Sequence, residues 1–120
     1  MRALDGTTLA DLIDVGGAEF AEEIVTLFLR DAPDRLAQAE EAEQAGNTAG
    51  VARQAHALYG ASGQLGAVGL RDACATCEED ARAGRADALA ADVGRMREAY
   101  VALAAALDAW QRERREGGAA

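Results

Sequence analysis

Residues 86–110 read ADALAADVGRMREAYVALAAALDAW and carry the strongest indication of the fold. Large apolar residues recur here at alternating steps of four and three: Leu89, Val93, Met96, Tyr100, Leu103, Leu107 and Trp110. This spacing keeps one face of an α-helix apolar over about three heptads, as in helices that pack side by side. It predicts a long helix with a buried seam, meaning the line of residues that faces neighbouring helices.

Two segments further upstream repeat the same spacing. One seam would consist of Val51, Ala55, Leu58, Ser62 and Leu65, and the other of Leu70, Cys74, Cys77 and Ala81. Glycines at positions 16–17, 46, 66 and 84 divide the chain into five helical stretches. We therefore predict an all-α fold, an antiparallel four-helix bundle with a short N-terminal capping helix.

The first two helices are expected at about residues 8–15 and 18–45. Pro33 lies inside the second helix and should kink it, because proline removes a helix hydrogen bond. The apolar stripe of this helix is expected to contain Phe20, Ile24, Leu27, Phe28, Leu36 and Ala39. Asn47 and Asp87 stand where the third and last helices need N-caps.

The composition and charge of the chain narrow the classes of partner. With 120 residues, half of them hydrophobic, residues 1–120 are expected to form a single stand-alone domain. Its ordered core should span about residues 4–111, with a frayed polar tail at 112–120.

The net charge of −9 disfavours nucleic acid and anionic membrane surfaces as partners. No targeting segment is visible, and the longest apolar run, at 99–107, is too short to span a bilayer, so we expect a cytoplasmic protein. The chain length and an intact bundle suggest a monomer.

His56 is the only histidine and the most informative residue. At about 100° per residue, it lies roughly 130° from the centre of its helix's seam and should face solvent. Its neighbours on that face are all small: Ala49, Ala52, Gly60 and Gly63. A glycine inside a helix costs on the order of 1 kcal/mol relative to alanine, so these glycines suggest that another molecule approaches closely. An exposed, unprotonated imidazole can attack phosphorus, although an ordinary surface histidine explains the geometry equally well.

Residues 55–67 read AHALYGASGQLGA and resemble the signature A-H-x-L-K-G-x-[SA]-x-x-[LI]-G. This is the signature of histidine-containing phosphotransfer (HPt) domains of two-component phosphorelays. The resemblance extends across nearly the whole chain, through the short leading helix, the double glycine, residues 28–33 and the helix that contains Leu70 and Glu78.

The resemblance implies a phosphocarrier without kinase activity of its own. His56 would accept a phosphoryl group from a receiver-domain aspartate or a kinase and pass it to a response-regulator aspartate. Glu78 would hold the other imidazole nitrogen, and its place about 70° off its own seam is compatible with that reach. Receiver domains and a hybrid histidine kinase would be the partners, docking over Ala52, Gly60, Gly63 and Gln64. The chain would need no cofactor, and the receiver would supply a divalent cation.

One position departs from the family pattern. Tyr59 stands where the family usually has a lysine, and tyrosine can donate a hydrogen bond but brings no charge. Arg53, one turn before His56, is a candidate substitute for that charge, although a solvated side chain is the simpler interpretation. The departure leaves open an alternative function, a phosphorylation-incompetent docking module that binds a kinase or receiver.

Cys74 and Cys77 form a C-x-x-C motif, which raises a third possibility, a thiol-redox or zinc protein. Both cysteines fall on a predicted seam, and reactive pairs usually lie at a helix N-terminus. A structural zinc site needs four ligands, which one distant histidine cannot readily complete. We therefore interpret them as core residues and expect no metal site.

Overall fold

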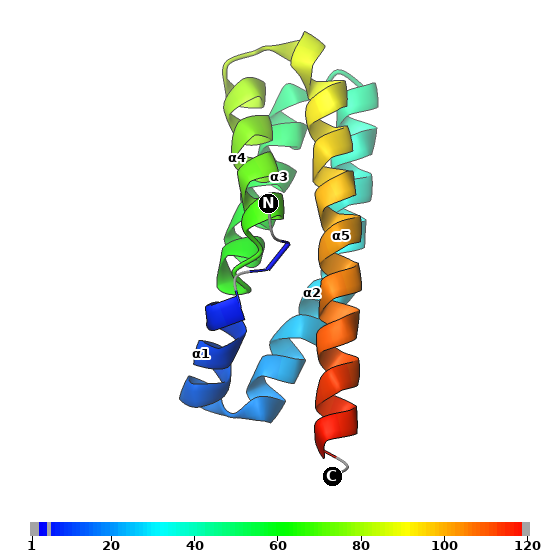
Figure 1. Ribbon diagram of the computed structural model, residues 1–120. Coiled ribbons are helices and arrows are strands. Elements are labelled where there is room, and N and C mark those ends of the chain that lie inside the picture. The colour runs from blue at the N-terminus through cyan, green and yellow to red at the C-terminus, as the bar shows by residue number, and fades with distance from the viewer. Residues whose placement is uncertain (1–2, 5, 119–120) are drawn as a thin grey trace.

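The computed structural model describes residues 3–4 and 6–118. It consists of five helices: α1 (Gly6–Gly16), α2 (Ala18–Gln44), α3 (Thr48–Gln64), α4 (Val68–Arg82) and α5 (Ala86–Gly118). No strand occurs among the described residues. The predicted all-α class is confirmed, and Figure 1 shows α2–α5 running side by side.

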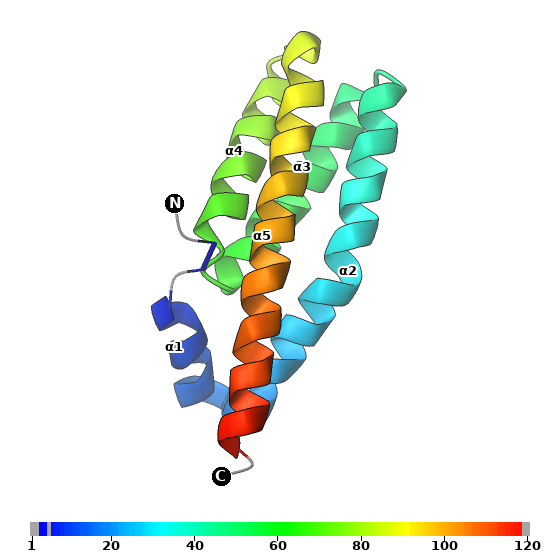
Figure 2. The ribbon, with the colours of Figure 1, turned by 45° about the vertical axis from the view of Figure 1, so that its right-hand side comes forward.

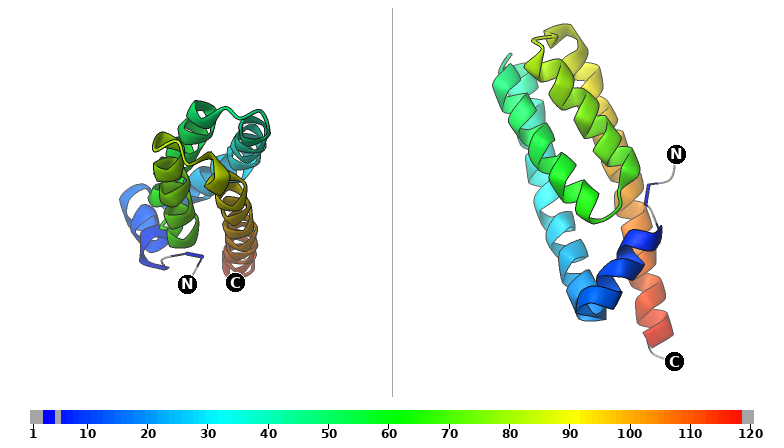
Figure 3. Two further views of the ribbon diagram at one scale, coloured as in Figure 1. Left: turned by 90° about the horizontal axis from the view of Figure 1, so that it is seen from above. Right: turned by 90° about the vertical axis from the view of Figure 1, so that its left-hand side faces the viewer.

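The four long helices form a closed ring around one core. α3 packs against α2 and α4, and α5 packs against α4 and α2, which the view down the bundle in Figure 3 shows. α1 packs against α2 and lies across the end of the bundle where α2 begins. Its Leu9 is buried in the common core, as expected of a capping helix.

The predicted seams of α3, α4 and α5 form the core. All seam residues of α3 and α4 are buried, and α5 buries Leu89, Val93, Met96, Leu103 and Leu107. Tyr100 and Trp110 of α5 are partly buried and pack against this core. The seam prediction for these helices is therefore confirmed.

Glycines close the C-terminal ends of α2, α3 and α4 in the same way. At the end of α2, Gly46 has φ of 71°, and the next residue, Asn47, donates its backbone N–H to the carbonyl of Ala42 at 2.8 Å. Positive φ costs glycine little because it has no Cβ. The same bond joins Ala67 to Ser62 and Arg85 to Asp80. These turns reverse the chain within a few residues and set the antiparallel order.

The two predicted N-caps have different outcomes. Asn47 caps α3, since its side-chain oxygen accepts the backbone N–H of Gly50 at 2.9 Å. Asp87 is not a cap, because α5 begins one residue earlier and places Asp87 in its first turn. A carboxylate there still interacts favourably with the helix dipole.

The predicted apolar stripe of α2 is wrong at Phe20 and Leu27, whereas Phe28, Leu36 and Ala39 are buried as predicted. Phe20 and Leu27 are 39% and 44% exposed. The buried residues of α2 include three alanines among larger side chains: Ala21, Val25, Phe28, Ala32, Leu36 and Ala39. The prediction favoured the largest side chains, whereas alanines allow α2 to approach its neighbours closely. α2 continues through Pro33 and bends along its length (Figure 2).

The predicted fraying of residues 112–120 is also wrong for the described part of that tail, because α5 remains helical to Gly118. Arg112 pairs with Asp108 one turn earlier at 3.0 Å. Arg114 pairs with Glu22 of α2 at 3.3 Å and lies 5.2 Å from the ring centroid of Trp110. These contacts attach the last turns of α5 to the bundle. Residues 119–120 lie outside the described part.

Candidate functional site

His56 projects from the middle of α3 into solvent, and its side chain is 68% exposed. The predicted exposure is therefore confirmed. Its Nδ1 lies 3.1 Å from both carboxylate oxygens of Glu78 on the neighbouring helix α4. Because an ionised carboxylate can only accept, Nδ1 carries the hydrogen, and in the neutral ring Nε2 then holds the free lone pair. Nε2 has no hydrogen-bond partner among the described residues.

Glu78 is held in place from its own helix. Arg82, one turn later on α4, donates Nε–H to Glu78 Oε2 at 2.7 Å. Partial burial by itself would raise the pKa of Glu78, but the hydrogen bonds from Arg82 and His56 outweigh it and the pKa is lowered. Glu78 is therefore an ionised acceptor at neutral pH, and its predicted reach to the histidine is observed.

The residues on the exposed face of α3 leave room for another molecule. A Cβ added at Gly60 would meet nothing within 4 Å, and one added at Gly63 would meet only Arg71 Cδ at 4.0 Å. No contact within the described chain therefore requires glycine at these positions, although each destabilises the helix. Tyr59, one turn after His56, is 41% exposed.

Ala52 does not belong to this exposed face. It is only 5% exposed, since it lies where α3 packs against α4, and it joins the core. Together with Ala49, Arg53, His56 and other residues, it lines an open hollow of about 550 Å³ on the N-terminal side of the histidine. Ala52 can shape this hollow but offers a partner little surface.

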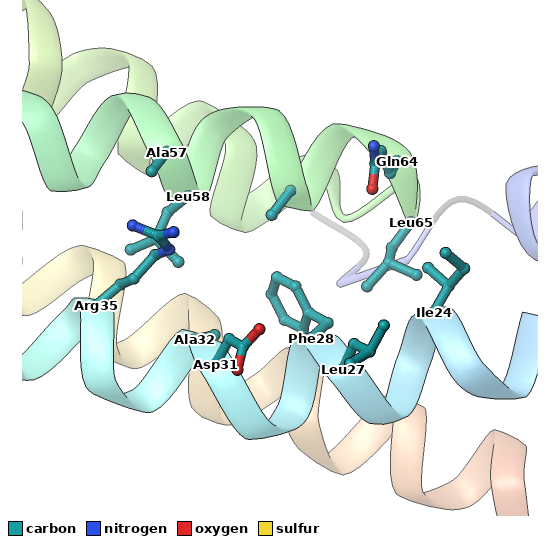
Figure 4. Close-up of a pocket in the computed structure, with 11 residues that line it drawn as sticks. Ile24, Leu27, Phe28, Asp31, Ala32, Arg35, Ala57, Leu58, Gln64 and Leu65 are labelled. Carbon is teal, nitrogen blue, oxygen red and sulfur yellow. The ribbon is translucent and has the colours of Figure 1, made fainter.

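A second concavity, a groove of about 220 Å³, runs between α2 and α3 on the other side of the site (Figure 4). Phe28, Leu58 and Leu65 form its apolar floor, and the half-exposed Leu27 and the exposed Gln64 lie at its edges. The sequence prediction missed this groove because it assigned Leu27 to the core.

Arg82 was missed as well. Its spacing of four residues after Glu78 is that of an ion pair along a helix, so the sequence contained a signal for the contact. Nothing in the pattern distinguished this pair from the many other acid–arginine pairs of the chain.

Cys74 and Cys77 are buried free thiols. Burial, the largest cause, and nearby negative charges raise the pKa of each thiol to about 12, so both remain protonated at neutral pH. Their burial supports the core interpretation. Among residues 3–4 and 6–118, no group of three or more His, Cys, Asp or Glu side chains is placed to hold a metal ion. Within the same residues, no helix is long and apolar enough to cross a membrane.

Comparisons with known proteins agree with this geometry. A family model described as the Hpt domain matches residues 23–113. The crystal structure of histidine-containing phosphotransfer protein B (HptB) from Pseudomonas aeruginosa PAO1 is similar, with a TM-score of 0.87 and 28% sequence identity. That match covers 92% of this chain and 96% of the other. No curated protein sequence matches significantly. The chain belongs to the Hpt domain family and is a histidine phosphotransfer protein of phosphorelays.

Proposed function

We propose that this protein carries a phosphoryl group on Nε2 of His56. It accepts the group from a receiver-domain aspartate, or from a kinase, and passes it to the aspartate of a response regulator. The observation that supports this most directly is the orientation of the exposed ring. Its Nδ1 faces the carboxylate of Glu78, while Nε2 has no partner among residues 3–4 and 6–118.

In the accepting step, the Nε2 lone pair attacks the phosphorus of an aspartyl phosphate. A P–N bond forms, the P–O bond to the aspartate breaks, and the bonding pair leaves with the restored carboxylate. The imidazole becomes positively charged, and ionised Glu78 stabilises it through Nδ1–H. Donation to a response regulator is the reverse reaction with a different aspartate. The receiver would contribute its aspartate and a divalent cation.

The proposed partner surface lies on α3 around and beyond His56. Gly60 and Gly63 leave the helix surface bare, so that a loop carrying the aspartate can come close to the ring. The apolar groove with Leu27 and Gln64 continues this surface onto α2. A receiver domain that covers both would exclude water from the transfer and bury apolar surface that the free protein leaves exposed.

The test is phosphoryl acceptance by wild type and His56→Gln from phosphoramidate and from a panel of aspartyl-phosphorylated receivers. We expect labelling of wild type and none of His56→Gln, with the same helical circular dichroism spectrum for both. Glutamine keeps a polar side chain at an exposed position, so the bundle should not be affected. Undiminished labelling of His56→Gln would exclude His56 as the acceptor.

A second function is favoured by Tyr59, which leaves the usual lysine position without a charge. The protein would then bind a kinase or receiver and regulate it without being phosphorylated. Calorimetric binding to the same receivers, measured beside labelling, separates the two functions. Binding without labelling of wild type would support the docking module over the carrier.

A further inference from the structure

The hollow on the N-terminal side of His56 has an unusual charge for this protein. Two arginines line it, Arg53 from α3 and Arg82 from α4, and no carboxylate of the described residues does so. The remainder of its lining is small or uncharged, including Thr48 and Ala49. A cationic hollow beside the histidine stands out in a chain with a net charge of −9.

Both arginines have hydrogen-bonding capacity to spare. Arg82 uses only its Nε–H, toward Glu78, and its terminal amino groups make no hydrogen bond to any described residue. Arg53 is exposed and forms no hydrogen bond or ion pair with the described part of the chain. Most other described arginines pair with a carboxylate, as Arg112 does with Asp108. Free guanidinium N–H groups suit phosphate oxygens in charge and in geometry.

These arginines lie on the other side of His56 from position 59, where the family usually has a lysine. Tyr59 lies one turn after His56, whereas Arg53 lies one turn before it, and Arg82 approaches from the neighbouring helix. Positive charge is therefore present beside the ring, on the side opposite to Tyr59.

We propose that the phosphoryl group carried by His56 lies over this hollow, where Arg53 and the terminal amino groups of Arg82 donate hydrogen bonds to its oxygens. The proposal rests on the proposed function, because it assumes that His56 is phosphorylated. Arg82 then has two roles: its Nε–H positions Glu78, and its other N–H groups bind the phosphoryl oxygens. Glu78 is the carboxylate that faces the ring, and it contacts Nδ1 on the other side from the phosphorylated nitrogen.

The test is a pH titration of the phosphohistidine followed by ³¹P NMR, after labelling with phosphoramidate. Nearby cations favour the more negative form of the phosphohistidine and so lower the pH at which it gains a proton, on the ring or on the phosphoryl oxygens. We expect Arg53→Ala and Arg82→Ala each to raise this midpoint by about half a pH unit, and the double variant to raise it further. Arg112→Ala is the matched control, since it removes the same charge from an exposed helix position on α5. If Arg53→Ala and Arg82→Ala both had the same titration midpoint as Arg112→Ala, the proposal would be overturned.

A double-mutant cycle separates the two roles of Arg82. If Arg82 acted only by holding Glu78, Arg82→Ala would change nothing further in a Glu78→Ala background. We expect the shift of the midpoint to persist in that background, and its disappearance would leave Arg82 as a positioning residue alone. Should Glu78→Ala lose the helical spectrum, Glu78→Gln serves in its place because it removes the charge and keeps the shape.

The same labelling distinguishes failure of this inference from failure of the proposed function. Absence of phosphohistidine on wild type would overturn both. Labelled wild type with arginine variants that titrate like the control would overturn only the placement of the phosphoryl group and leave the carrier function standing.

Discussion

Two carboxyl groups on adjacent helices, Glu78 of α4 and Asp92 of α5, each pair with an arginine but have pKa values shifted in opposite directions. Each accepts a hydrogen bond from an arginine about one turn later on its own helix: Glu78 from Arg82 at 2.7 Å, and Asp92 from Arg95 at 2.5 Å. The pKa of Glu78 is nevertheless lowered, while that of Asp92 is raised.

The opposite pKa shifts result from the second neighbour of each carboxyl group, His56 or Asp80, and from its exposure to solvent. Glu78 faces an exposed histidine, which can become a cation. Asp92 is only 1% exposed, and its Oδ2 accepts no hydrogen bond from an N–H or O–H group of the described residues. Its carboxyl group interacts instead with the carboxyl group of Asp80. Burial, the largest cause, and the neighbouring Asp80 carboxylate favour a proton on Asp92. An arginine alone therefore does not determine the state of a carboxyl group in this bundle.

The largest expected effect is on the rate of phosphoryl acceptance, which should depend on Glu78 but not on Asp92. Glu78→Ala should reduce the rate of phosphoryl acceptance by His56 about ten- to hundredfold, because the ring loses its orientation and the stabilisation of its positive charge. Asp92→Asn should leave that rate unchanged, since Asp92 does not contact the ring. Initial rates of labelling with phosphoramidate measure both, and an equal loss in the two variants would refute the distinction.

A smaller effect concerns stability and tests the buried carboxyl. A raised pKa means that the contribution of Asp92 to stability is fully present below its unfolded pKa and is lost as pH rises through its folded pKa. Asp92→Asn replaces this group with a neutral one that can donate to Asp80. We expect it to raise the free energy of unfolding by about 1 kcal/mol at pH 8 relative to wild type.

Urea unfolding at several pH values measures this effect. The gain should shrink as pH is lowered towards the unfolded pKa of aspartate. The pKa of Asp80 is lowered, chiefly by its hydrogen bond with Asp92 and then by that with Arg85, so its own contribution has the opposite sign and is lost as pH falls. A variant less stable than wild type at pH 8 would show that Asp92 is needed there as an anion.

The smallest expected effect concerns the positive charge around His56, on the functional side of the comparison. Tyr59→Lys restores the lysine that is usual in the family. If Arg53 and Arg82 already supply positive charge beside His56, the rate of acceptance should change by less than about twofold. Labelling of the variant beside wild type measures it. A large acceleration would mean that a missing cation limits the native protein.

The sequence correctly predicted the burial or exposure of residues where these follow from helical phase. Leu58 and Met96 were expected in the core because they share a seam with other apolar residues, and both are fully buried. The exposure of His56 follows from the same phase. The contact of Glu78 with His56 was implied by the resemblance to HPt domains, and the phase of Glu78 was only compatible with it. The predictions from helical phase succeeded because each depends on one helix and its direction toward the core.

Predictions that depend on the distance between helices failed. Ala52 is buried although it lies off the predicted seam of α3, because α3 and α4 approach closely. Leu27 is exposed because the face of α2 that contains Val25, Phe28 and Ala32 packs against the core instead. The contact between Arg114 and Glu22, about which no prediction was made, joins residues from opposite ends of the chain. No local pattern encodes such spacings, which depend on how all the helices pack together.

The glycine turns at both ends of α3 have a consequence for signalling. Residues 45–47 and 65–67 connect α3 to its neighbours, and both connections are tied by backbone hydrogen bonds. The helix that carries His56 thus has no long flexible segment beside it that a phosphoryl group could rearrange. In the proposed reaction, information would travel through this protein as a covalently attached group, and any change of shape would take place in the proteins before and after it.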